Sequence, residues 1–397
     1  MVFLAGCTSE PKAILDAVRA EPDLWQNQCL VGAFIPGVNN QDFSALGRRT
    51  AVRSIFATPG LRPGASAGTV QPLPLHYSAF WSYLAEPGRV DVVYTEVPLP
   101  AEDGTVGLGL NADFCLAPIE AGAKLVGIIN PRMPDVRSGP RLAVDRFCAF
   151  VEDEHELPIY DAGPVDPAID AIGKRIVSLL RDGDTLQLGL GKVQAAVLQH
   201  LGQNGTTGLA YHSGMLSTPI QAALDRGIFS RGITTGTALG SSDFYDSLAE
   251  REEITFSPVK VTHAQSTFAR MERFISVNSV IEVDLYGQAN GEFVQDEQVS
   301  GHGGLIDFMR GARQSRGGLS ILALPSTGKG GKFSRIVPSL SSLVPVTVAR
   351  SDVDMVITEH GIADLRYAST EERAEKLISI ADPAFRGELQ ASWTRTA

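Results

Sequence analysis

With 397 residues, the chain is too long for one ordinary hydrophobic core, and its length predicts two or three domains. Hydrophobic residues account for 44% and charged residues for 20%, a balance typical of a globular protein in water. The formal net charge of -11 argues against nucleic acid or an anionic membrane as the main partner, and no apolar run has membrane-spanning length.

The first part of the chain alternates short apolar runs with amphipathic segments, which is typical of parallel α/β domains. Residues 90–97 are apolar until Glu96, so they predict a strand covered on both faces, with Glu96 at its carboxyl end. Pro11 is expected at the first position of a helix. The other predicted strands are residues 2–5, 29–34, 51–56, 124–130 and 146–152, and helices are predicted at 12–20 and 112–123. Residues 69–75 lead into His76, after which a helix is expected through Phe80, Trp81 and Leu84.

An acidic segment, residues 152–158, ends in proline, and the residues after it are rich in glycine and proline. Such composition predicts a domain boundary near residue 160, although a surface loop within one domain is the alternative. We therefore expect two domains, residues 1–160 and residues 161–397.

The second part repeats the alternation of strands and helices. Asp166 is expected to cap a helix at residues 167–180, in which apolar side chains recur at helical spacing. Further predicted strands are 184–188, 274–277, 280–285, 321–324, 344–349 and 355–358, and further helices are 193–201, 219–226 and 370–380. Residues 207–217 predict a strand whose carboxyl end brings His212, Ser213 and Gly214 to a cleft between the domains.

Several long motifs of the second part, at residues 282–288, 300–312, 323–329, 334–338, 356–366 and 382–386, resemble those of the acetyl-CoA hydrolase/transferase family. Residues 9–11, 73–76 and 130–134 match this family more loosely. The resemblance implies two open α/β domains of CoA-transferase type with the active site in the interdomain cleft. It also implies an acyl-CoA substrate, with coenzyme A as the substrate moiety, and a homodimer or higher homo-oligomer.

The family's nucleophile is a glutamate that attacks the acyl-CoA carbonyl and then forms a glutamyl-CoA thioester. Gly214 occupies that position in this chain, and no glutamate lies between Glu156 and Glu250. Because glycine has no side chain, it cannot form a covalent intermediate. The resemblance therefore implies the fold more strongly than the reaction.

Other departures from the family pattern concern the same predicted cleft. His263 stands where the family has an asparagine, His302 where it has an aliphatic residue, and Glu96 where it usually has a glutamine. The resemblance still implies an oxyanion hole at Gly303 and Gly304 and a thioester-proximal carboxylate, for which the matching residue is Glu359.

Four of the seven histidines, His76, His212, His263 and His302, map to one predicted cleft. Each could be a buried structural residue, but together with Glu96 they form a set that can transfer protons near pH 7. His212, His263 and His302 could also bind a metal. They lack the short-range spacing of metal ligands, and no metal site is predicted.

Two segments are candidates for binding CoA phosphates. Gly189, Leu190 and Gly191 precede a helix and could offer backbone N–H groups to an anion, or could form an ordinary tight turn. The glycine-rich segment 326–335 carries positive charge that suits phosphates, although it could equally be a mobile surface loop. Its basic residues are Lys329, Lys332 and Arg335.

These observations leave three functions open. The first is hydrolysis of an acyl-CoA, or action on a small carboxylic or aromatic substrate, by histidine or Glu96 general acid–base chemistry with the Gly304 N–H stabilising the oxyanion. The second is a CoA-independent lyase or isomerase that cleaves C–C or C–O bonds of a small hydroxylated or aromatic substrate by proton abstraction. The third is a non-catalytic acyl-CoA binder. The four cysteines share no CxxC spacing, so the reduced cytoplasm is the expected location.

Overall fold

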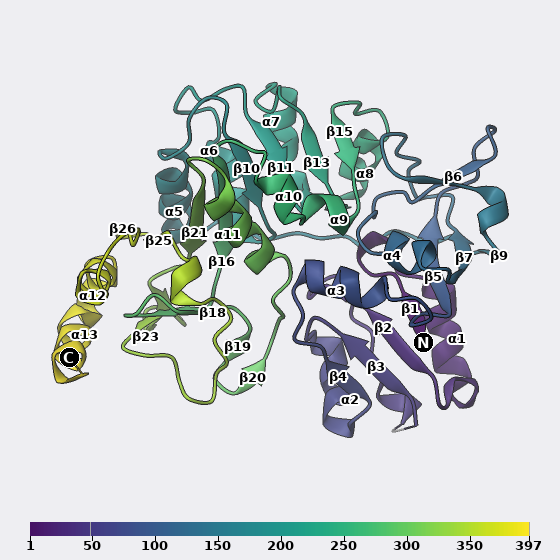
Figure 1. The fold of residues 1–397 in the computed structure, drawn as a ribbon, viewed down its shortest axis with the longest axis horizontal. Helices are drawn as coiled ribbons and strands as arrows, with labels where there is room; N and C mark the ends of the chain where they lie inside the picture. The colour runs from purple at the N-terminus through teal and green to yellow at the C-terminus, as the bar shows by residue number, and fades with distance from the viewer. Residues whose placement is uncertain (48, 397) are drawn as a thin grey trace.

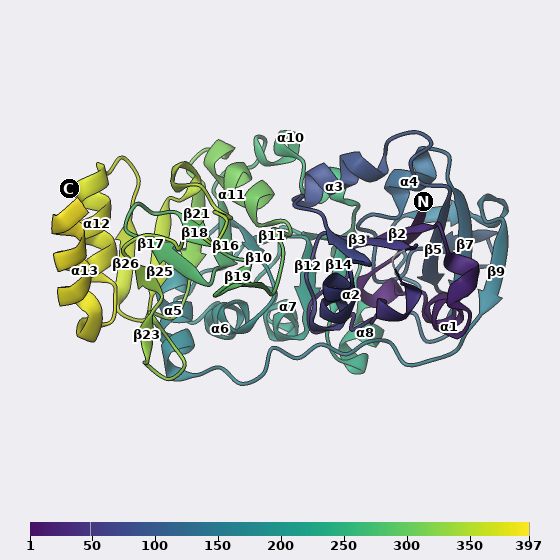
Figure 2. The same cartoon turned by 90° about the horizontal axis from the view of Figure 1, so that it is seen from below.

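Two parallel sheets with flanking helices form most of the molecule, which we describe from a computed structural model over residues 1–47 and 49–396. In Figures 1 and 2 the sheets lie side by side along the long axis, and the C-terminal helices lie at the end far from the N-terminal sheet. None of the helices in the described ranges is long and apolar enough to cross a membrane.

The N-terminal sheet has the strand order β4-β3-β2-β1-β5-β7-β9, and all its neighbouring strands are parallel. The chain begins in the middle of the sheet, builds strands outward on one side, and then returns to add strands on the other side. Its strands are β1 Val2–Leu4, β2 Cys29–Gly32, β3 Ala51–Ser54, β4 Val70–Pro72, β5 Val92–Val97, β7 Lys124–Ile129 and β9 Ala149–Glu152. The helices are α1 Lys12–Ala20, α2 Arg62–Ala67, α3 Tyr77–Leu84 and α4 Leu116–Glu120, and a small ribbon pairs β6 Thr105–Gly107 with β8 Arg141–Ala143.

The C-terminal sheet repeats this arrangement in the order β15-β13-β11-β10-β16-β21-β25-β26, with only β26 antiparallel to its neighbour. Its strands are β10 Thr185–Leu188, β11 Ala210–His212, β13 Ile233–Thr235, β15 Ile254–Phe256, β16 Phe274–Ser279, β21 Leu319–Ala323, β25 Met355–Thr358 and β26 Gly361–Asp364. The helices are α5 Pro167–Val177, α6 Lys192–His200, α7 Gln221–Asp225, α8 Ser242–Leu248, α9 Val259–Thr262, α10 Gln265–Phe268, α11 Leu305–Gln314, α12 Thr370–Ser379 and α13 Pro383–Thr396. Small ribbons join β12 Met215–Ser217 to β14 Thr237–Leu239, β17 Glu282–Asp284 to β18 Ala289–Asn290 and β24 Ile336–Val337, β19 Phe293–Val294 to β20 Glu297–Gln298, and β22 Thr327–Gly328 to β23 Phe333–Ser334.

Local sequence signals account for several helix boundaries. The Asp166 carboxylate accepts a hydrogen bond from the Ile169 N–H, which confirms the predicted cap of α5. The apolar side chains of that helix lie in the main core of the C-terminal half. Ser369 and Glu372 form a capping box at the start of α12. Pro11 is the residue before α1 rather than its first residue.

Three predicted elements differ from the structure because tertiary hydrogen bonds override the local pattern. Residues 207–217 form two short strands, β11 and β12, since the Gly214 carbonyl accepts hydrogen bonds from the N–H groups of Gly236 and Thr237. The helix predicted at 112–123 is confined to α4, because the Ala112 N–H donates to the Gly236 carbonyl. The strand predicted at 344–349 is wrong, and Val348 makes only an isolated bridge to Ala289.

A connection without regular structure links the two halves of the chain. β9 ends at Glu152 and α5 begins at Pro167, so the expected boundary near residue 160 falls within this connection. The two halves also contact each other directly, for example through a bridge between Asn111 and Thr237.

Candidate active site

A cavity of about 290 Å³ lies at the carboxyl end of the C-terminal sheet, where the two halves meet. The loop after β10 contributes Gly189 and Leu190, and the end of β16 contributes Asn278 and Ser279. These two strands are neighbours although the chain continues from β10 to β11, so the strand order reverses between them, and open α/β sheets bind ligands at such a point. The remaining lining residues are Ile35, Pro36, Phe56, Tyr77, Tyr160, Gln187, Gln194, Ser213, Gly214, Met215, His263, Gly291, Ser300, Gly301, His302, Gly303, Gly304, Leu305 and Phe308.

The break between β11 and β12 places Gly214 on the cavity wall. A Cβ atom at this position would lie 3.1 Å from Cε1 and 3.3 Å from Nε2 of His263. The imidazole of His263 therefore lies against the position of such a Cβ atom and would have to shift by a few tenths of an ångström to admit it. Gly214 and His263, which both depart from the family pattern, are therefore adjacent in space. Neither their separation in the sequence nor the motifs predict this contact.

His263 is a buried, neutral histidine. Burial is the main cause that lowers the pKa of its imidazole to about 3, while the nearby Asp307 carboxylate opposes this shift. Its Nδ1 lies 2.8 Å from the Thr262 hydroxyl, whereas Nε2 has no hydrogen-bond partner among the described residues. The ring lies between Tyr77 and Phe308, with centroid distances of 4.8 and 4.3 Å. An unpaired nitrogen in such an apolar setting is available to a bound ligand.

His302 pairs with a buried carboxylate at the same cavity. Its Nδ1 lies 3.2 Å from Oε1 of Glu292, which is 4% exposed, and the imidazole itself is partly accessible. The Thr347 hydroxyl donates to the other oxygen of Glu292 at 2.9 Å and holds the carboxylate in place. A carboxylate beside Nδ1 favours the tautomer with the proton on that nitrogen, which leaves Nε2 able to accept a proton.

Gly303 and Gly304 lie on the cavity at the start of α11, as the oxyanion prediction requires. Neither backbone N–H donates to an acceptor among the described residues. The N-terminal half holds this loop, because the Tyr77 N–H donates to the Gly303 carbonyl at 3.0 Å and the Ala57 N–H donates to the Ser300 carbonyl at 3.3 Å. Unpaired N–H groups at a helix N-terminus suit a negatively charged oxygen.

Two of the predicted histidines support the site from outside the cavity. His76 lies 3.0 Å from Oδ1 of Asp307, and Ser78 donates to both oxygens of the same carboxylate, so this cluster joins α3 to α11. His212 donates from Nε2 to the Thr262 carbonyl at 2.9 Å, and burial lowers its pKa to about 4. This hydrogen bond positions the segment that carries His263. Neither histidine lines the cavity, whereas Ser213 does.

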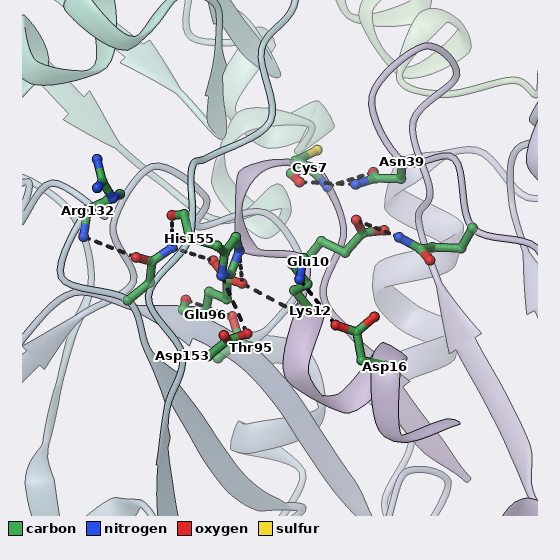
Figure 3. Close-up of polar contacts among 12 residues, drawn as sticks. Cys7, Glu10, Lys12, Asp16, Asn39, Thr95, Glu96, Arg132, Asp153 and His155 are labelled. Atoms are coloured by element: carbon green, nitrogen blue, oxygen red, sulfur yellow. Dashed lines mark hydrogen bonds and ion pairs between the residues drawn. The ribbon is translucent and has the colours of Figure 1, made fainter. Parts of the chain in front are cut away.

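Glu96 is not at the cavity, contrary to the expectation that it shares a cleft with the histidines. Figure 3 shows it at the carboxyl end of the N-terminal sheet, where its Oε1 lies 2.8 Å from Nε2 of His155. The Asn130 side chain also donates to this carboxylate. Burial raises the pKa of Glu96, and His155 and Asn130 oppose that shift. The sequence offered no signal for His155 beyond its place in an acidic segment.

The structure also separates the proposed metal ligands. His212, His263 and His302 do not form a close group of donor atoms. In the described ranges such a group of three is found only for Glu96, Asp153 and His155, whose atoms already contact one another as ion pairs.

The residues proposed to bind CoA phosphates and the thioester are distributed over two places. Gly189 and Leu190 line the cavity, and Gly191 precedes α6. Glu359 is outside the lining and accepts hydrogen bonds from the N–H and hydroxyl of Ser326, at 2.8 and 2.7 Å. The basic residues of the adjacent hairpin, Lys329, Lys332 and Arg335, are also outside the cavity, and both lysines are exposed.

The comparisons with known proteins agree with this architecture. Residues 240–393 match the family model described as the acetyl-CoA hydrolase/transferase C-terminal domain. The succinyl-CoA:cyclohexane-1-carboxylate CoA transferase of Geobacter metallireducens is 32% identical over 344 residues, covering 85% of this chain and 79% of that protein. The chain belongs to the acetyl-CoA hydrolase/transferase family.

Two further relatives extend the match within this family. The 4-hydroxybutyrate coenzyme A transferase of Clostridium kluyveri is 29% identical, with 98% of this chain and 92% of that protein covered. The crystal structure of RipA from Yersinia pestis superposes with a TM-score of 0.92 at 26% identity and covers 100% of this chain and 94% of that one. The expected CoA-transferase fold is thereby confirmed, and the protein is an enzyme of a family that acts on acyl-CoA thioesters.

Proposed function

We propose that this enzyme hydrolyses an acyl-CoA by direct attack of water, without the acyl-glutamyl intermediate of CoA transfer. The observation that carries the proposal is the pairing of Gly214, which has no side chain, with His263, whose ring lies 3.1 Å from the position of a Cβ atom there. No aspartate, glutamate or cysteine is among the residues that line the cavity. A carboxylate nucleophile therefore has no counterpart at this site.

His302 is the general base in this mechanism. The thioester carbonyl lies at the start of α11, with its oxygen toward the N–H groups of Gly303 and Gly304. Nε2 of His302 accepts a proton from water as the water oxygen bonds to the carbonyl carbon. Glu292 stabilises the imidazolium that forms, as a carboxylate does in other carboxylate–histidine pairs.

The second half of the reaction returns the proton. The tetrahedral intermediate collapses, the C–S bond breaks, and Nε2 of His302 donates its proton to the departing sulfur. The products are a carboxylic acid and free CoA. His263 is a weaker candidate for the base, because burial holds its pKa at about 3, far below the value that suits proton abstraction near pH 7. Its ring instead shapes the cavity beside Gly214.

The test uses the wild-type protein and butyryl-CoA, with and without an excess of acetate as CoA acceptor. We expect stoichiometric free CoA and butyrate, a rate unaffected by acetate, and an unchanged intact mass after an acid quench. Formation of acetyl-CoA, or a mass increase that matches enzyme-bound CoA, would contradict direct hydrolysis. Calorimetric titration with CoA separates this function from the CoA-independent lyase or isomerase, since saturable CoA binding is expected only of an enzyme or binder for acyl-CoA.

Glu292→Gln isolates the role of the buried carboxylate. The amide keeps the shape of the side chain but removes the charge that stabilises the imidazolium, so we expect kcat to fall about 100-fold with little change in KM. An unchanged kcat would exclude the Glu292–His302 pair from the mechanism. Absence of wild-type hydrolysis together with saturable CoA binding would instead favour a non-catalytic acyl-CoA binder.

A further inference from the structure

The charges in the cavity bear on which acyl groups it can accept. No lysine or arginine is among its lining residues. A carboxylate on the substrate would therefore have to find its partner among neutral polar groups or the two histidines.

Neither histidine supplies a free positive charge. His263 is buried beside two aromatic rings, and its pKa of about 3 keeps the imidazole neutral near pH 7. His302 faces the carboxylate of Glu292, so a proton on its ring is already balanced by that negative charge. A carboxylate buried here would lose its hydration without gaining an ion pair, which is strongly unfavourable.

Aromatic side chains form one continuous wall of the cavity. The centroid of Phe56 lies 6.1 Å from that of Tyr77, and Tyr77 and Phe308 flank His263. Burial raises the pKa of Tyr77 well above its usual range, so its hydroxyl stays neutral. Such a wall offers edge and face contacts to a ring or a branched alkyl group.

The volume is sufficient for a cyclic group. An apolar protein cavity of about 150 Å³ accommodates benzene, and this cavity measures about 290 Å³. The carbonyl must lie between His302 and the glycines at the start of α11 if water is to attack it. The carbon attached to that carbonyl then lies within the same cavity, beside the aromatic wall.

We propose that the enzyme takes the thioester of an uncharged apolar acid, with an aromatic or alicyclic ring as the best fit, and rejects acyl groups that end in a second carboxylate. This inference rests on the proposed function, since it assigns the acyl group to the same site. It names a substrate class that the family alone does not fix.

The test compares wild-type turnover of benzoyl-CoA and cyclohexanecarbonyl-CoA with that of succinyl-CoA and glutaryl-CoA, by thiol release. We expect kcat/KM for the diacid thioesters to be at least tenfold lower, and about 100-fold lower if their carboxylate enters the cavity unpaired. A ratio below tenfold, or a preference for the diacids, would overturn the inference while leaving hydrolysis itself intact.

A second measurement keeps the inference testable if no thioester is hydrolysed, in which case the proposed function fails separately. The affinities of the same four thioesters are then measured by calorimetry, and the ring-bearing pair should bind at least tenfold more tightly. Equal affinities would overturn the inference.

A charge introduced into the cavity should change the preference. Met215 lines the cavity and is partly exposed, so Met215→Arg places a guanidinium where a substrate carboxylate could pair with it. We expect the succinyl-CoA to benzoyl-CoA ratio of kcat/KM to rise at least tenfold relative to Met215→Leu, which serves as the uncharged reference. A ratio that does not change would count against exclusion by charge.

Discussion

The two sheets share a strand order, so their carboxyl ends are equivalent places in the two halves of the molecule. The side chains at these two places nevertheless differ in chemistry. In the N-terminal half the order reverses between β1 and β5, and the residues there are ionisable: Glu10 follows β1, and Glu96, the penultimate residue of β5, contacts His155. In the C-terminal half it reverses between β10 and β16, and the residues there are glycines, neutral amides and hydroxyls around a cavity.

The comparison shows that ionisable residues do not by themselves mark a reactive site. Both oxygens of the Glu96 carboxylate have partners, His155 and Asn130, and neither Glu96 nor His155 borders the cavity (Figure 3). Around Gly214 the unpaired groups border the cavity: the Nε2 atom of His263 and the N–H groups of Gly303 and Gly304 have no partner among the described residues, and all three residues line it. Groups left unpaired beside a cavity are the ones available to a substrate.

The largest expected effect separates the two sheet ends directly. His302→Ala removes the proposed base and should lower kcat/KM for acyl-CoA hydrolysis about 1000-fold. Glu96→Gln, at the other sheet end, should leave kcat/KM within about twofold, because this carboxylate does not line the cavity. Both are measured by thiol release under the same conditions. Comparable losses in the two variants would break the distinction drawn between the two ends.

The second prediction concerns the contact between Gly214 and His263. The Cβ atom of a glutamate at position 214 would lie 3.1 Å from the His263 ring, closer than ordinary contact, so Gly214→Glu alone should support CoA transfer poorly. Gly214→Glu combined with His263→Asn relieves this contact, and we expect at least tenfold faster formation of an enzyme–CoA adduct than in the single variant. The adduct is followed by intact mass with butyryl-CoA. His263→Asn alone is the control and should form none, whereas equal rates in the single and double variants would show that the ring is no obstacle.

The third prediction tests how tightly the glycines at the start of α11 are packed. A Cβ atom at Gly304 would lie 2.3 Å from Nε2 of His263, whose ring is confined between Tyr77 and Phe308. Gly304→Ala should therefore lower the free energy of unfolding by about 1–3 kcal/mol, measured by urea denaturation. Gly387→Ala on α13 is the matched control, since a Cβ atom there meets no atom within 4 Å. That variant should be neutral or slightly stabilising, and an equal loss in both would refute the packing argument.

Much of the fold could be predicted because its signals are local. Lys12–Ala20 and Met355–Thr358 occur as α1 and β25 with the predicted bounds, since an amphipathic period and a short buried run each fix one element. The break at Gly214 was not predictable in this way. It depends on hydrogen bonds from Gly236 and Thr237, which only the assembled ribbon brings into place.

The site was predictable where a family motif carried it and not where a tertiary partner decided the role. Gly214, His263 and His302 all line the cavity, as the motifs implied. Glu292 was missed because nothing in the sequence marks it as the partner of His302. Glu96 was placed in the wrong site because its partner, His155, lies on a distant segment that local patterns do not connect to it.

The last prediction lies at the N-terminal sheet end and concerns Glu10. Burial is the main cause that raises the pKa of this carboxyl to about 7, from an ordinary value of 4.5, and its Oε1 has no hydrogen-bond partner among the described residues. Between pH 4.5 and 7 the folded protein keeps a proton on Glu10 that the unfolded chain releases, so stability falls as the pH rises through this window. The raised pKa of His155, due mainly to Glu96, acts in the same direction.

Glu10→Gln removes the ionisable group but keeps an acceptor for the Gln41 side chain, which donates to the Glu10 carboxylate at 3.0 Å. At pH 8 we expect the variant to be about 2 kcal/mol more stable than the wild type, whereas at pH 4.5 the two should be nearly equal. Urea denaturation at both pH values measures this difference, and Glu21→Gln, at an exposed position, is the control. If Glu10→Gln gives the same pH dependence of stability as the wild type, the ionised Glu10 carboxylate is no less stable in the folded protein than in water. The contrast in energy with the cavity, whose lining has no carboxylate, would then be wrong. If the dependence flattens, the buried Glu10 carboxylate lowers the stability at the N-terminal sheet end, a cost that the cavity lining avoids because it contains no carboxylate.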